Sequence, residues 1–75
     1  MSRKDKINFI KRIATELGEV QLGGACGKYF SIVDNGTSVL ALSFVGKYGY
    51  GSAVVDRLNG KTIDAIYGDL VQDFA

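Results

Sequence analysis

The residues best suited to chemistry in this 75-residue chain lie in a glycine-rich segment, Lys47-Tyr48-Gly49-Tyr50. A cation beside two aromatic rings can stack unpaired bases while it holds a phosphate, and tyrosines also anchor protein interfaces at low entropic cost. The two rings could equally cap the core with their hydroxyls in water. We take Lys47, Tyr48 and Tyr50 as the candidate partner-binding residues.

The N-terminal segment is the second candidate, because it gathers basic residues although the net charge of the chain is only +1. A basic helix face can contact phosphates, but it is more often simply solvated. The candidate nucleic-acid-binding residues of this segment are Arg3, Lys4, Lys11 and Arg12.

The third candidate is the glycine-rich segment that contains Cys26, the single cysteine of the chain. The segment ends in Gly27-Lys28, as a phosphate-binding loop does. However, Leu22 stands where the first glycine of that motif belongs, and Tyr29 stands where its magnesium-binding hydroxyl belongs. Cys26 has no histidine to activate it, so we interpret this segment as a glycine turn that contains a small, half-buried thiol.

The composition argues against catalysis. The chain has no histidine, which removes the commonest general base, the usual activator of serine and cysteine nucleophiles, and most zinc sites. The carboxylates form no readable cluster. We therefore predict no catalytic residue, metal or cofactor. A single cysteine favours a reducing, cytoplasmic setting, and no apolar run approaches the roughly 20 residues that span a membrane.

The strongest structural signal is an Asn35-Gly36 pair between two β-rich runs at 28–33 and 38–45. Asn-Gly favours a two-residue hairpin turn, and this turn fixes the register. The expected cross-strand pairs are Asp34 with Thr37, Ile32 with Val39, and Phe30 with Ala41. The opposite face of the hairpin carries Tyr29, Val33, Leu40, Leu42 and Phe44. Both faces are apolar, so both require cover.

Two amphipathic helices are expected, at about 3–17 and 62–74. Apolar residues recur at helical spacing in both, Gly18 is placed to end the first, and Thr62 is the natural N-cap of the second. Gly68 lies inside the second helix, where close approach of another backbone would explain it.

Residues 52–58 read as a strand or a short helix, and the strand is preferred because β-branched neighbours lie between glycine turns. The predicted fold is thus one α+β domain of order α-β-β-β-α, with a further short strand allowed at Glu19–Leu22. The antiparallel sheet is built on the Gly27–Val45 hairpin and covered by the two helices. Either the helices divide between its faces, or a second copy covers the open one.

This order of elements resembles that of the double-stranded RNA-binding domain, although Lys61-Thr62-Ile63-Asp64 replaces its basic cluster with an acidic turn. A second resemblance, to double-psi β-barrel proteins of the expansin and lytic-transglycosylase type, implies that Asp56 is catalytic. The resemblance rests on four short sequence motifs: Gly24-Ala25-Cys26-Gly27, Leu40-Ala41-Leu42-Ser43, Val54-Val55-Asp56-Arg57 and Ile63-Asp64. The spacing between the second and third motifs is too short for the strands of that barrel.

We conclude from the sequence that this is a small, non-catalytic, cytoplasmic binding protein that acts by protein–protein interaction. A phage- or mobile-element-type regulator or inhibitor of a larger partner fits its size, and a homodimer is an open alternative. The second hypothesis is a nucleic-acid-binding module that uses the basic helix and the Lys47–Tyr50 loop. The third is an enzyme that uses Asp56.

Overall fold

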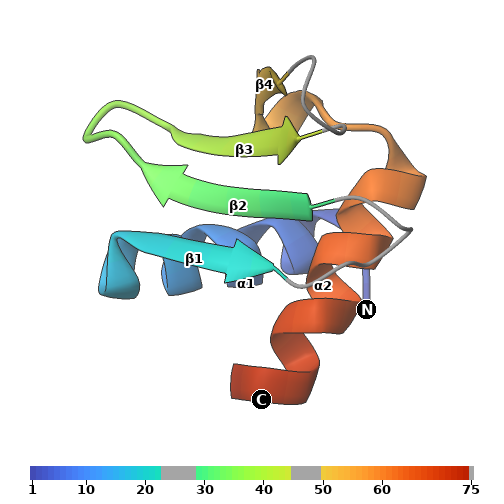
Figure 1. The fold of residues 1–75 in the computed structure, drawn as a ribbon. Helices are drawn as coiled ribbons and strands as arrows, with labels where there is room; N and C mark the ends of the chain where they lie inside the picture. The colour runs from blue at the N-terminus through green and yellow to red at the C-terminus, as the bar shows by residue number, and fades with distance from the viewer. Residues whose placement is uncertain (23–28, 45–49, 75) are drawn as a thin grey trace.

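The computed structural model describes residues 1–22, 29–44 and 50–74 as a helical layer packed on a four-stranded antiparallel sheet (Figure 1). The strands lie in the order β1-β2-β3-β4, so each neighbour in the sequence is a neighbour in space. The elements are α1 (Arg3–Leu17), β1 (Glu19–Leu22), β2 (Tyr29–Asp34), β3 (Val39–Phe44), β4 (Tyr50–Val54), the 3-10 helix η2 (Val55–Arg57) and α2 (Gly60–Phe74). The predicted α+β class is confirmed, with the short strand at 19–22 as a full member of the sheet.

Helix α1 has the predicted bounds, because its sequence signals both ends. The Ser2 hydroxyl accepts a hydrogen bond from the Asp5 amide at 3.2 Å, which satisfies one of the free N–H groups of the first turn. At the other end Gly18 has a φ of 80°, a left-handed conformation that favours glycine, and its N–H donates to the Ala14 carbonyl at 2.7 Å.

The predicted hairpin register is wrong by two residues. Asp34 pairs with Val39 and Ile32 with Ala41, so the turn is longer than an Asn-Gly loop. Polar side chains stabilise this longer turn: Asn35 Oδ1 accepts from the Thr37 and Ser38 amides at 3.0 and 2.8 Å. A shift of two residues keeps every side chain on its predicted face.

The segment that was ambiguous in the sequence divides into two elements. Its first part continues β4, which ends at Val54, and its second part is the 3-10 helix η2. The predicted N-cap of the last helix is wrong, because α2 begins at Gly60 and Asn59 caps it. Asn59 Oδ1 accepts from the Thr62 amide at 2.9 Å, so Thr62 already lies within the first turn.

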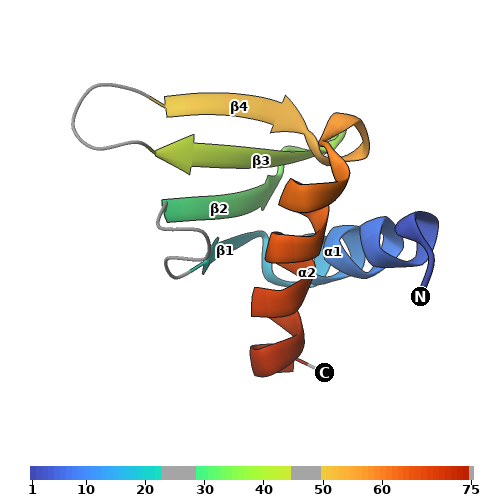
Figure 2. The ribbon, with the colours of Figure 1, turned by 90° about the vertical axis from the view of Figure 1, so that its right-hand side faces the viewer.

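Both helices lie on the same face of the sheet, so they do not divide between the two faces (Figure 2). They also hold each other: the Phe9 and Tyr67 rings meet edge to face at 5.3 Å, and Lys6 Nζ lies 2.8 Å from Asp64 Oδ1. The buried core between helices and sheet includes Ile7, Ile10, Ile13, Val20, Leu22, Ile32, Ala41, Val55, Ile63, Ile66 and Leu70.

No helix in residues 1–22 or 50–74 is long and apolar enough to cross a membrane.

Candidate functional site

The side of the sheet turned away from the helices carries a row of apolar residues. The register places Val33 beside Leu40 and Leu40 beside Val54, so three strands contribute to one continuous row. Leu42 lies two residues beyond Leu40 on β3 and on the same face. The side chains of Val33, Leu40, Leu42 and Val54 are all half-buried. We call these four residues, Val33, Leu40, Leu42 and Val54, the open sheet face.

Polar residues lie at three of the four ends of the two rows that pass through Leu40 and Leu42, and Val54 lies at the fourth. Glu19 lies beside Val33 on β1, and Gln21 lies two residues further along the same strand. At the other edge Ser52 lies beside Leu42. Glu19, Gln21 and Ser52 are exposed, so polar residues border the apolar ones on β1 and beside Leu42 on β4, while Val54 itself reaches the β4 edge. An apolar centre with a polar rim is the usual anatomy of a protein-binding surface.

Ser31 lies on the same side of the sheet, between Gln21 and Leu42. It is only 2% exposed, and its hydroxyl has no hydrogen-bond partner among the described residues. A buried hydroxyl without a partner costs stability, so this position is not optimised for the isolated fold.

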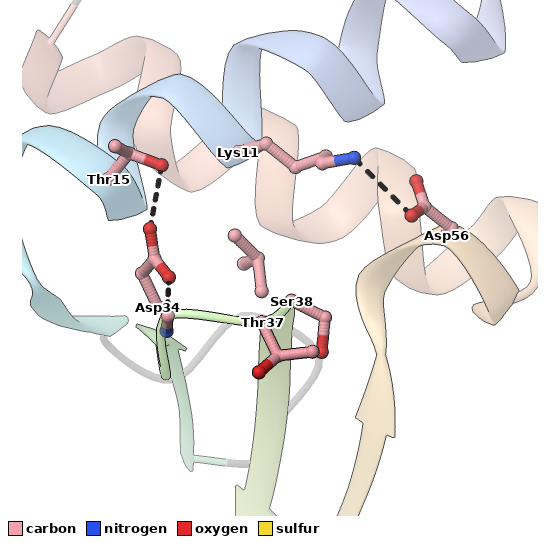
Figure 3. A pocket seen from close by; sticks show the side chains of 8 residues that line it. Lys11, Thr15, Asp34, Thr37, Ser38 and Asp56 are labelled. Carbon is pink, nitrogen blue, oxygen red and sulfur yellow. Dashed lines mark hydrogen bonds and ion pairs between the residues drawn. The ribbon is translucent and has the colours of Figure 1, made fainter.

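A second feature is a polar hollow of about 260 Å³ on the helical side, between α1, the β2–β3 turn and η2 (Figure 3). The Thr15 hydroxyl donates to Asp34 at 2.9 Å, and the Gly36 amide donates to the other Asp34 oxygen at 2.8 Å. Across the hollow, Lys11 Nζ lies 3.4 Å from Asp56 Oδ2. These contacts tie the first helix to the hairpin turn and to η2.

The hollow is poorly arranged for catalysis. The hydrogen bond from the Gly36 amide, together with that from Thr15, holds the pKa of Asp34 below its ordinary value of 3.8. A general acid or base working near neutral pH needs a shift in the opposite direction. Asp56 lies in η2 and faces Lys11 rather than a second carboxylate. No group of three or more possible metal ligands occurs among the described residues.

The structure separates the cations that the sequence grouped together. Arg3 donates to the Leu58 carbonyl at 2.6 Å, and Lys11 pairs with Asp56, so both are engaged at η2. The Arg12 guanidinium lies over the Phe9 ring, 5.3 Å from its centre. Lys4 is exposed in the first turn of α1.

The structure describes only the last residue of the predicted tyrosine loop, Tyr50. Lys47 and Tyr48 lie outside the described residues, as does Cys26 with its glycine-rich segment. Tyr50 is the first residue of β4 and pairs with Phe44. The open sheet face was visible in the sequence as the second apolar face of the hairpin. The sequence does not identify this face as a site, because it does not show that both helices pack on the opposite side.

Comparison of the chain with protein-family models, with curated protein sequences and with solved structures gives no match. The order of elements that resembles the double-stranded RNA-binding domain is present in the fold with one further strand, β1. The resemblance to double-psi β-barrels finds no support, because the described sheet has four strands in sequential order and is open rather than closed into a barrel.

Proposed function

We propose that this protein binds another protein through the open sheet face and performs no catalysis. The observation that carries the proposal is the row of half-buried apolar residues on the side of the sheet that neither α1 nor α2 covers. Covering the exposed part of these half-buried side chains with a partner would be favourable, because it removes apolar surface from water. Its rim of Glu19, Gln21 and Ser52 would orient the partner.

The chemistry of this surface favours a protein over a nucleic acid. The charged residue that borders it on β1 is an acid, Glu19, which would repel phosphate. Two of the four candidate phosphate-binding cations, Arg3 and Lys11, already hold η2 to the first helix. The proposed partner is therefore a protein with an apolar patch of its own.

The finer parts of the proposal rest on size and composition. A single-domain chain with one cysteine suits a cytoplasmic regulator or inhibitor of a larger partner, of the kind that phages and mobile elements encode. The open side is formed by four strands of four to six residues, so it is small beside the roughly 800 Å² that one partner contributes to a standard interface. Self-association into a homodimer would enlarge the surface, and we include it in the proposal.

The test compares two double variants in a pull-down from lysate of the source or host cell, with nuclease added to half of each sample. Leu40→Ser with Leu42→Ser makes the open sheet face polar. The matched control, Leu17→Ser with Phe74→Ser, removes two exposed apolar side chains from the helices instead. Circular dichroism first establishes that both variants fold.

We expect one protein that resists nuclease, is retained by the wild type and the control, and is lost with the open-face variant. Equal capture by both double variants would contradict the proposed surface. Loss of the bound species with nuclease would contradict the proposed class of partner and favour nucleic acid.

A further inference from the structure

The two edge strands of the sheet differ in how well they are protected. Strand β4 pairs with β3 alone, and no described element lies along its outer edge in Figure 2. Its sequence, Tyr50-Gly51-Ser52-Ala53-Val54, contains no charged residue and no proline. Gly51 and Ser52, near its middle, are exposed. Its outward backbone N–H and C=O groups are thus accessible to another extended strand.

Strand β1 has features that discourage such pairing. It has four residues, begins with the exposed Glu19, and contacts both helices. Short length, edge charge and cover from neighbouring elements are the usual ways in which proteins protect a sheet edge from other chains. Strand β4 is only one residue longer, but it carries no charge and no described element covers its outer edge, so the asymmetry points to β4 as the edge used for association.

We propose that β4 pairs in antiparallel fashion with β4 of a second copy of this chain, with Ser52 at the two-fold axis. Full overlap then places Ser52 opposite Ser52, Gly51 opposite Ala53, and Tyr50 opposite Val54. This inference rests on the self-association included in the proposed function and names the surface that produces it. It does not depend on the partner that the open sheet face binds.

A second copy fits this edge for two reasons. An antiparallel pair of identical strands is self-complementary, because each backbone donor meets an acceptor of the other copy about the two-fold axis. The three central residues, Gly51 to Ala53, are small and neutral, so neither charge nor bulk opposes close approach.

The geometry of the pair also explains the small size of the open sheet face. A two-fold axis through the paired edges, perpendicular to the sheet, leaves the helices of both copies on one side. The two open faces then join across the axis, since Val54 lies in the strand next to the junction. The combined surface is twice that of one copy, which brings it closer to the roughly 800 Å² that one partner contributes to a standard interface. The dimer would therefore present a larger docking surface than one copy does.

The experiment is sedimentation velocity at low salt, over protein concentrations from about 10 µM to about 1 mM. Ser52→Lys and Ser52→Glu each place like charges opposite each other at the axis. We expect each variant alone to associate several-fold more weakly than the wild type. An equimolar mixture of the two should associate about tenfold more tightly than either variant alone. The control is Gln21→Lys, an exposed position on the same side of the sheet but on the other edge strand, and it should behave as the wild type.

A cysteine cross-link provides an independent measurement if the charged variants fold poorly. In a Cys26→Ser background, Ser52→Cys should form a disulfide-linked dimer under mild oxidation, whereas Gln21→Cys should not. A wild type that stays monomeric at about 1 mM would overturn both this inference and the proposed self-association. A wild-type dimer that is unaffected by charge at position 52, together with a Ser52→Cys variant that forms no cross-link, would overturn the edge pairing alone. The pull-down with the Leu40 and Leu42 variants tests partner binding separately.

Discussion

The two sides of the sheet are made by the same strands and differ in what covers them. On β2, Ile32 is fully buried beneath the helices, while the next residue, Val33, is half-buried on the open side. On β3, Ala41 and Leu40 show the same contrast. Both sides carry apolar residues, but the described chain supplies helices for only one. The covered side thus holds the buried core, and the open side carries the half-buried apolar residues through which we propose that the protein binds.

The helices cannot be shared between the sides because they are bound to each other as well as to the sheet. The Phe9–Tyr67 ring contact and the Lys6–Asp64 ion pair join α1 to α2 directly. Lys6 also lies over the Tyr67 ring, 5.6 Å from its centre. Moving one helix to the open side would break these contacts and expose the apolar stripes of both helices.

The largest expected effect comes from comparing one truncation on each side. Ile32→Ala removes a fully buried side chain and should lower the free energy of unfolding by about 2–5 kcal/mol. Leu40→Ala, from a half-buried position on the open side, should cost about 1 kcal/mol. Urea denaturation of both variants measures the difference. Equal losses would mean that the open side contributes as much to the isolated fold as the core does.

Ser31 gives a smaller effect with the opposite sign. Its hydroxyl is buried on the open side without a partner among the described residues, so Ser31→Ala should raise the free energy of unfolding by about 1 kcal/mol. Thermal unfolding of the variant measures this gain. If stability rises and partner capture falls, Ser31 serves binding at the expense of stability. If stability falls, the hydroxyl has a structural role that the described contacts do not include.

The sequence predicts some parts of this molecule well and others poorly, for identifiable reasons. Helix α1 is predicted to the residue because Ser2 and Gly18 act locally. The hairpin turn is not, because the side chains of Asp34 and Asn35 bond the turn amides and outweigh the Asn-Gly preference. The open sheet face depends on where both helices pack, which is a long-range property. Each helix has an apolar stripe, but no local sequence pattern indicates which side of the sheet that stripe packs against.

Gly68 allows a test of the outer surface of the helices. Its expected explanation, close approach of another backbone, is not found: an added β-carbon would meet no described atom within 4 Å. Gly68→Ala should therefore stabilise α2 by up to about 1 kcal/mol, because alanine loses less backbone entropy in a helix. Thermal unfolding measures the gain. A destabilised variant would contradict this assignment. A stabilised variant that captures less partner would show that binding also involves the helical side.

Asp34 provides the smallest effect, because its hydrogen bonds are exposed, and it tests how α1 is held over the covered side. Its pKa in the folded protein lies below 3.8, since the Gly36 amide and the Thr15 hydroxyl both stabilise the charged form. The contribution of Asp34 to stability is therefore fully present above the pKa of the unfolded chain, and it is lost as the pH falls through the folded value. The stability advantage of the wild type over Asp34→Asn should accordingly shrink between about pH 5 and about pH 2. Urea titrations across this range measure the stability difference, with Asp73→Asn at the end of α2 as the baseline.

A pH-independent difference between wild type and Asp34→Asn would mean that Asp34 acts through its shape and neutral hydrogen bonds. The charge of Asp34 would then contribute nothing to holding α1 over the sheet.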